Sequence, residues 1–188
     1  QKVSGKNMLA LAAIKRYIQN LISYDEQAVL KGEEIELLAL EQKLNMTRFI
    51  AALGIEINFR GTVDRVDRHN GFIRVIDYKT GQVASSKLGI YDWSLVVSDP
   101  DYGQARQLLL YALMWNENNP ENQAHKAGII ALKQYDKGVL YVGEKATPNA
   151  KKRETELTKE VLAKATATFD QLCMQLFDSN SPFQSAEL

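Results

Sequence analysis

Three charged side chains, Asp64, Asp77 and Lys79, stand in two β-rich runs on either side of the dipeptide Asn70-Gly71. An Asn-Gly pair between two such runs predicts a β-hairpin with a tight type I′ turn. Counting outward from this turn places Asp64 directly opposite Asp77. Opposed residues of a hairpin point to the same face of the sheet, with Cβ atoms roughly 4.5–5.5 Å apart, and Lys79 shares that face because side chains alternate along a strand. The sequence therefore predicts two carboxylates and one ammonium group on one patch.

Such a patch is suited to metal-assisted hydrolysis of a phosphodiester. Like charges opposite each other destabilise a sheet, and a divalent cation between Asp64 and Asp77 would turn their repulsion into ligation. Mg²⁺ is often held by one or two carboxylates, with waters and phosphate oxygens completing its shell, and the backbone carbonyl of Tyr78 would be a third protein ligand. The metal would activate a water and neutralise phosphate charge. Lys79, expected opposite Thr62, would orient or deprotonate that water or stabilise the transition state.

Three segments resemble one known family: residues 61–67 (GTVDRVD), 75–81 (VIDYKTG) and 107–112 (QLLLYA). They are similar to motifs of the PD-(D/E)xK nuclease superfamily, and specifically of its RecB-like branch from helicase–nuclease proteins of DNA recombination and repair. The resemblance implies a restriction-endonuclease-like core that cuts DNA with Mg²⁺ or Mn²⁺. It assigns Asp64 and Asp77 as metal ligands, and it assigns Asp77 and Lys79 as the D-x-K pair.

The same resemblance implies further residues beside the metal. Gln107 and Tyr111 match the branch's Q-x-x-x-Y motif and would contact the DNA backbone or order the catalytic centre. They are four residues apart and so share a helix face, and Gln104 lies on the same stripe and would join them. The alternative for Tyr111 is an ordinary core tyrosine. Glu41 would supply another carboxylate, in the manner of acidic residues on the family's early elements, or is simply an exposed glutamate.

The composition is that of an ordinary soluble domain. The chain has 188 residues, of which 45% are apolar and 24% charged, enough for one domain with a core. Its formal net charge is zero, so it lacks the strongly basic balance of an autonomous nucleic-acid-binding protein. A nuclease domain of this kind would rely on a helicase domain or subunit to hold the DNA.

Cysteine content and hydropathy indicate the cellular compartment in which the chain is expected to lie. The single cysteine, Cys173, lies in an apolar helical stripe and is expected to be buried. The chain therefore builds no disulfide framework, which suits the cytoplasm, and no apolar run approaches the ~18 residues that span a membrane.

Both ends read as mid-protein sequence, so we expect residues 1–188 to be one RecB-like domain from a longer protein. Many RecB-like domains also carry an iron–sulfur cysteine cluster and an early histidine. This sequence has neither such a cluster nor a histidine before Asp64, which puts the activity of the isolated fragment in doubt.

Periodicity places the motifs on elements and predicts an α/β or α+β fold: a mixed central sheet that contains the catalytic hairpin and is flanked by helices. An N-terminal helical part (1–33) would precede the catalytic core (34–178). The expected elements are a helix over 6–24, a segment over 34–44 that is ambiguous between strand and helix and that the resemblance favours as a strand, hairpin strands over 55–68 and 72–79, a long loop over 82–102, a helix over 103–117, strands over 126–134 and 139–142, and a helix over 154–178.

Other charged residues near the hairpin have structural interpretations. Asp67 is expected opposite Arg74, where the two would form a cross-strand ion pair. His69 flanks the turn and is expected to be solvated, and His125 has no visible partner.

Two functions of different classes are consistent with these patterns. The leading one is a metal-dependent deoxyribonuclease. The alternative is a non-catalytic DNA-binding or scaffold module of the same fold, which the missing histidine favours and the intact Asp64, Asp77 and Lys79 disfavour. An unrelated small-molecule enzyme is disfavoured because the chain has no Gly-rich phosphate loop or nucleophile triad.

Overall fold

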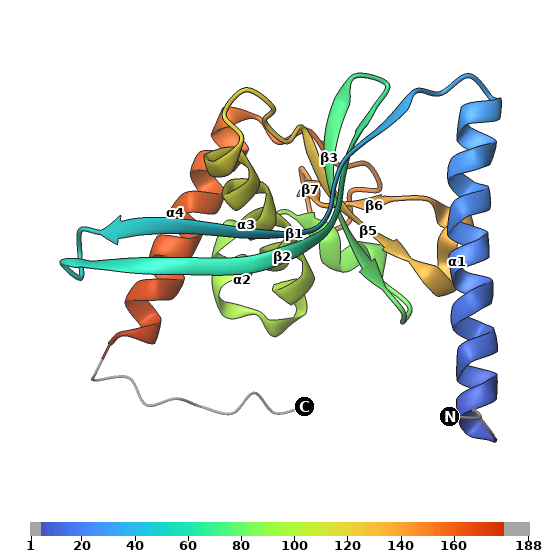
Figure 1. Cartoon of the computed structure of the whole chain (residues 1–188). Helices are drawn as coiled ribbons and strands as arrows, with labels where there is room; N and C mark the ends of the chain where they lie inside the picture. Colours follow the sequence, from blue (N-terminus) through green and yellow to red (C-terminus); the bar gives the residue numbers. More distant parts are fainter. Residues whose placement is uncertain (1–4, 179–188) are drawn as a thin grey trace.

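Two successive hairpins form most of the central sheet in the computed structural model, which describes residues 5–178 (Figure 1). Strands β1 (Ile35–Ile50) and β2 (Ile55–His69) make the first hairpin, and β2 and β3 (Phe72–Lys79) make the second. Asn70 and Gly71 have φ angles of 49° and 83°. These positive values are what a type I′ turn requires, so the predicted hairpin and its turn are confirmed. The ambiguous early segment is a strand, and it is longer than expected.

The sheet has five strands in the order β1-β2-β3-β5-β6 and is mixed. Strands β3 and β5 (Lys126–Ala131) run parallel, while β6 (Leu140–Tyr141) pairs antiparallel with β5. A parallel pair needs a crossover connection, which helix α3 (Gly103–Asn118) supplies. The apolar face of α3 packs on the sheet through Ala105, Leu108, Leu109, Ala112, Met114 and Trp115. A mixed sheet flanked by helices confirms the expected fold class.

The segment 82–102 was expected to be a loop, and the structure corrects this. It contains the 3₁₀ turns η1 (Ser85–Leu88) and η2 (Pro100–Tyr102), strand β4 (Gly89–Ile90) and helix α2 (Trp93–Ser98). Asp92 caps α2 by accepting from Ser94 N at 2.9 Å. The segment also buries Leu88, Ile90 and Val96 in the core. The helix cap and the buried apolar side chains therefore give this segment regular structure, although its length and its turn residues predicted a loop.

The elements after α3 also differ in extent from expectation. Strand β5 ends at Ala131 and is followed by the 3₁₀ segment η3 (Leu132–Lys137), where the Gln134 side chain accepts from Val83 N at 3.1 Å. The strand predicted over 139–142 is shorter and corresponds to β6, and a further two-residue strand, β7 (Gly143–Glu144), follows it. Strand β7 pairs in parallel with β4.

Helix α4 (Lys159–Leu176) begins five residues later than expected. The Thr158 side chain caps its first turn, accepting from Val161 N at 3.3 Å. The residues before the cap are extended, because Glu154 pairs with Glu144 and Leu157 N donates to the His125 carbonyl. The prediction that Cys173 is buried is confirmed.

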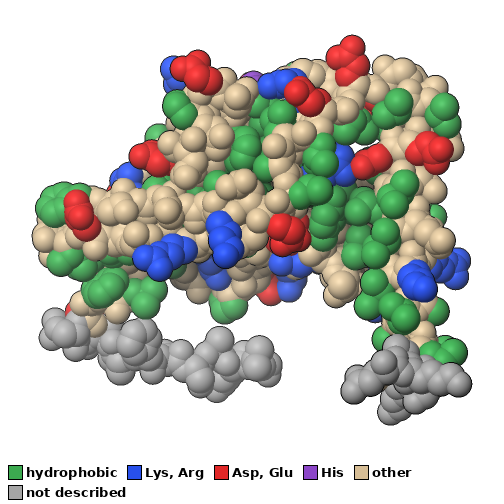
Figure 2. Space-filling view, viewed as in Figure 1, with side chains coloured by type: hydrophobic (Ala, Val, Ile, Leu, Met, Phe, Trp, Pro, Cys, Tyr) green, Lys and Arg blue, Asp and Glu red, His purple; other side chains and the backbone are tan. Residues whose placement is uncertain are grey.

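Helix α1 (Lys6–Leu30) stands at the edge of the molecule and packs mainly against η3 (Figure 1). It continues six residues beyond the predicted end. Much of its apolar surface is exposed (Figure 2). Leu9, for example, is 75% exposed. Across residues 5–178, neither α1 nor any other helix combines the length and apolar character needed to cross a bilayer.

Candidate active site

The two aspartates of the predicted site lie where strands β2 and β3 separate. The β2–β3 pairing runs from His69–Phe72 to Arg65–Ile76, in the predicted register. Within the described chain the pairing ends there, so neither the expected Asp64–Asp77 pair nor the expected Thr62–Lys79 pair belongs to it. On the other edge of β2, Thr62 pairs with Lys43 of β1.

Asp64 lies one residue beyond the last β2–β3 pair. Its Oδ2 atom accepts a hydrogen bond from the backbone N–H of Tyr78 at 2.6 Å. The carboxylate of β2 is thus fastened to the main chain of β3, between Asp77 and Lys79.

Asp77 is the most deeply buried member of the set, with a side chain only 6% exposed. Its Oδ1 accepts from Gln107 Nε2 at 3.2 Å, and its Oδ2 lies 2.8 Å from Lys79 Nζ. Apart from that ion pair, Oδ2 accepts no hydrogen bond of good geometry from residues 5–178. Burial raises the pKa of the Asp77 carboxyl above its ordinary value; Lys79 opposes the increase and Asp64 adds to it. A cation placed here would relieve both the burial of charge and the repulsion.

Gln107 connects the acid, the amine and the tyrosine. Its Oε1 accepts from Lys79 Nζ at 3.0 Å, and its Nε2 donates to Tyr111 Oη at 2.9 Å as well as to Asp77. One amide on α3 therefore orients both halves of the D-x-K pair. Gln104, one turn earlier, lines a hollow together with Gln107.

Gly61 allows α3 to approach the sheet at this point. A Cβ atom at residue 61 would lie 2.7 Å from Cε1 of Tyr111 and 2.9 Å from Cε of Met114. Only a residue without a side chain leaves this space. Gly61 was visible in the sequence motif, but its role depends on a contact with a helix about fifty residues away in the chain.

Glu41 occupies the β1 position opposite Asp64, because β1 pairs Leu40 with Arg65 and Gln42 with Val63. Its φ is 47° and it is exposed. A positive φ at a residue that is neither Gly nor Asn is uncommon, and such strain clusters at ligand-holding sites. The register thus brings Glu41 to the edge of β2 that carries Asp64, although residues 5–178 contain no three carboxylates grouped to bind one metal.

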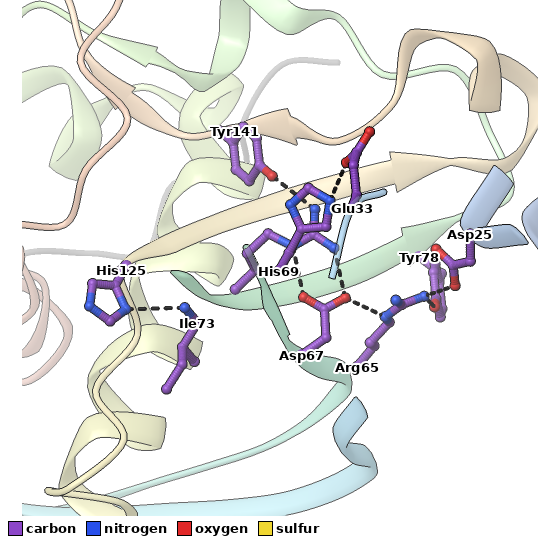
Figure 3. A network of polar contacts seen from close by, with 10 residues as sticks. Asp25, Glu33, Arg65, Asp67, His69, Ile73, Tyr78, His125 and Tyr141 are labelled. Carbon is purple, nitrogen blue, oxygen red and sulfur yellow. Dashed lines mark hydrogen bonds and ion pairs between the residues drawn. The ribbon is translucent and has the colours of Figure 1, made fainter. Parts of the chain in front are cut away.

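The opposite face of the hairpin carries a buried ionic network (Figure 3). The fully buried Asp67 accepts from Arg74 Nε and from Arg65 Nε, each at 2.7 Å. The expected Asp67–Arg74 pair is therefore confirmed, and Arg65 extends it. Arg65 Nη1 also contacts Asp25 of α1 at 2.5 Å and Tyr78 Oη at 3.5 Å.

Arg65 follows Asp64 in the chain and Tyr78 follows Asp77. The network therefore lies on the other face of the sheet, directly opposite the two aspartates. Asp25 had no signal in the sequence, where it is one of several charges on a helix.

Both histidines have partners, contrary to expectation. His69 Nε2 lies 2.5 Å from Glu33 Oε2, and His125 Nδ1 accepts from Ile73 N at 3.1 Å (Figure 3). Each contact ties a loop to the hairpin, so both histidines have structural roles away from Asp77.

The donor set at Asp64 and Asp77 fits Mg²⁺ or Mn²⁺. Hard divalent cations take oxygen ligands and commonly need only one or two carboxylates from the protein. Asp77 Oδ2 is a buried carboxylate oxygen short of hydrogen-bond donors, and Asp64 keeps a second oxygen beyond the one that Tyr78 N holds. Across residues 5–178, groups of three or more His, Cys, Asp or Glu placed to bind a metal do not occur, so a cation here would complete its shell with backbone oxygen, water or phosphate.

Comparison with known proteins agrees with this geometry. A family model described as the PD-(D/E)XK nuclease superfamily matches residues 5–187, nearly the whole chain. A search of curated proteins found no match.

Proposed function

Because this chain belongs to the PD-(D/E)XK nuclease superfamily, we propose that it hydrolyses phosphodiester bonds in DNA, with Mg²⁺ or Mn²⁺ held by Asp64 and Asp77. The superfamily consists mainly of nucleases that use such cations. The observation that carries the proposal is the buried Oδ2 of Asp77, which faces Lys79 Nζ at 2.8 Å beside the Asp64 carboxylate. The backbone carbonyl of Tyr78 is the proposed additional protein ligand.

The chain's own residues would divide the chemistry among them. A bound cation would neutralise charge on the phosphate and lower the pKa of a water molecule. Asp64 is fixed by the Tyr78 amide, so it needs little reorganisation to act as a ligand. Lys79 lies between Asp77 and the Gln107 carbonyl, an arrangement that would aim its amine at the phosphate or the attacking water. Gln107 and Tyr111 would hold this amine in place or contact the DNA backbone.

The biological setting follows as a second part of the proposal. We infer that the chain is a RecB-like domain acting in DNA recombination or repair, and the bridging position of Gln107 in the Q-x-x-x-Y motif supports this. The zero net charge supports dependence on an attached or associated helicase to deliver DNA. A reduced buried cysteine, Cys173, suits the cytoplasm.

Metal binding and cleavage test the proposal separately. Isothermal titration with Mn²⁺ should show binding to the wild-type chain and loss of binding in Asp77→Ala. Linear DNA should be cut with Mg²⁺ and remain intact with EDTA or in Lys79→Ala. Glu56→Gln, which changes an exposed carboxylate of the same strand β2, is the matched control and should behave as wild type.

The outcomes separate the candidate functions. Mn²⁺ binding without cleavage by the chain, alone or joined to its helicase, would favour the non-catalytic DNA-binding module. Absence of Mn²⁺ binding by the wild type would overturn the nuclease proposal.

A further inference from the structure

Two hollows lie beyond the catalytic residues and share one wall. The first, of about 400 Å³, is lined by the amides of Gln82, Gln104 and Gln107. The second, of about 260 Å³, contains Tyr91 and Lys145. Lys87 and Asp101 line both hollows. Because Gln107 also contacts Asp77 and Lys79, the first hollow opens directly beside the proposed reaction centre.

The second hollow is built by the small sheet of β4 and β7. These strands pair Gly89 with Gly143 and Ile90 with Glu144. The residues that follow, Tyr91 and Lys145, therefore leave the sheet side by side. Lys145 N donates to the Ile90 carbonyl at 2.7 Å. A Cβ at Gly89 would lie 2.3 Å from Lys145 Cδ, so the lysine stem lies across that glycine.

The shared wall is an exposed ion pair. Lys87 Nζ lies 2.5 Å from Asp101 Oδ1, and the two side chains are 45% and 60% exposed. Exposed pairs of this kind contribute little to stability. A phosphate could therefore replace Asp101 as the partner of Lys87 at little cost.

We propose that the two hollows form a track for an unpaired nucleic-acid strand that runs from the catalytic residues. The glutamine-lined hollow takes the nucleotide beside the scissile phosphate, Lys87 and Lys145 contact phosphates, and a base stacks on Tyr91. This inference rests on the proposed function, and it specifies the form of the substrate.

The chemistry of the lining favours a single strand over a duplex. Sites for unpaired strands combine basic groups along the backbone with aromatic rings on which bases stack, and Tyr91 is an exposed ring (42%) that lines the same hollow as Lys87 and Lys145. Amide side chains can both donate to and accept from the base edges that an unpaired strand exposes. Each hollow is close to the lower size limit of small-ligand pockets, a size that suits one nucleotide better than a base pair.

Binding of a short fluorescein-labelled oligothymidylate, measured by anisotropy without divalent metal, tests the track. Lys87→Gln and Lys145→Gln should each weaken binding about threefold to tenfold and each reduce the slope of log K against log[salt] by about 0.7. Tyr91→Ala should weaken it about tenfold. Asp101→Asn should instead tighten it several-fold, because it releases Lys87 and removes a repelling charge. Lys15→Gln, which removes an exposed lysine from α1, is the matched control and should bind as wild type.

A blunt duplex separates this track from a general basic surface. The same variants should change duplex affinity by less than about twofold, since the two hollows are too small for paired bases. Equal losses for duplex and single strand, or an Asp101→Asn variant that binds no tighter than wild type, would overturn the track. If the wild type cuts DNA but all four variants bind oligothymidylate as the wild type does, the proposed function stands and the track is overturned. If the four variants show the expected changes but the wild type binds no Mn²⁺, the track stands and the nuclease proposal is overturned.

Discussion

The backbone amide of Tyr78 donates a 2.6 Å hydrogen bond to the carboxylate of Asp64. The residue between the acid and the lysine of the D-x-K motif thereby positions the first acid of the site through its main chain. The bond satisfies one Asp64 oxygen and leaves the other for a ligand. It also joins the two strands at the point where their regular pairing has already ended.

Asp64→Asn should separate the charge of this residue from its hydrogen bond. The amide oxygen of asparagine can still accept from Tyr78 N, so the melting temperature should stay close to that of the wild type. Mn²⁺ affinity, measured by calorimetry, should fall by at least about tenfold because a charged ligand is lost. Asp64→Ala should in addition lose about 1–3 kcal/mol of stability, since the part-buried Tyr78 N–H loses its partner. Unchanged Mn²⁺ affinity in Asp64→Asn would exclude Asp64 as a ligand.

Asp77 should make wild-type stability depend on pH. Burial raises the pKa of this carboxyl from its ordinary value of 3.8, and Asp64 adds to the increase although Lys79 opposes it. A raised pKa in the folded state means that the ionised carboxylate disfavours folding. Relative to Asp77→Asn, the wild type should therefore lose stability as pH rises from about 3.8 through the raised pKa. Urea unfolding of both proteins across this range measures the difference, and a difference that is constant with pH would contradict the prediction.

Gly61→Ala should damage the site through packing. The added methyl group would lie 2.7 Å from Tyr111 Cε1 and 2.9 Å from Met114 Cε. Overpacking of this kind typically costs about 1–3 kcal/mol, and a displaced Tyr111 would pull Gln107 away from Asp77 and Lys79. We expect a lower melting temperature. We also expect a loss of DNA cleavage that is larger than destabilisation of the fold would cause by itself. Gly81→Ala is the matched control, because a Cβ there meets nothing within 4 Å, and it should leave both measurements unchanged.

Alanine substitutions at the two ends of the buried ionic network, Asp67 and Asp25, should reduce stability by very different amounts. Asp67 is fully buried between Arg65 and Arg74, so Asp67→Ala would leave two buried guanidinium groups without their shared carboxylate and should cost about 3–5 kcal/mol. Asp25 is 30% exposed, and Asp25→Ala should cost about 1 kcal/mol or less. Chemical denaturation measures both. Similar losses for the two variants would mean that the Arg65–Asp25 contact holds α1 more firmly than its exposure indicates.

Local patterns carried the prediction of the hairpin. The Asn70-Gly71 turn and the alternation on either side depend on neighbouring residues only, so the register from His69–Phe72 to Arg65–Ile76 could be counted directly. The α3 helix was equally readable from its own apolar stripe. By contrast, the segment 82–102 looked like a loop because its helix and 3₁₀ turns are short. They are held by caps and by side chains buried against distant strands.

The sequence by itself determined that Asp64, Asp77 and Lys79 belong to one hairpin and that Gln107 and Tyr111 share a helix face, since turn chemistry and helical spacing act over a few residues. Only the tertiary structure decided how these pieces meet. Tyr78 N reaches Asp64 where the β2–β3 pairing has ended, just before Arg65, and Gln107 reaches Asp77 and Lys79 because Gly61 leaves room for α3 against the sheet. Contacts of this kind join residues far apart in the chain, and the packing of the whole core sets them.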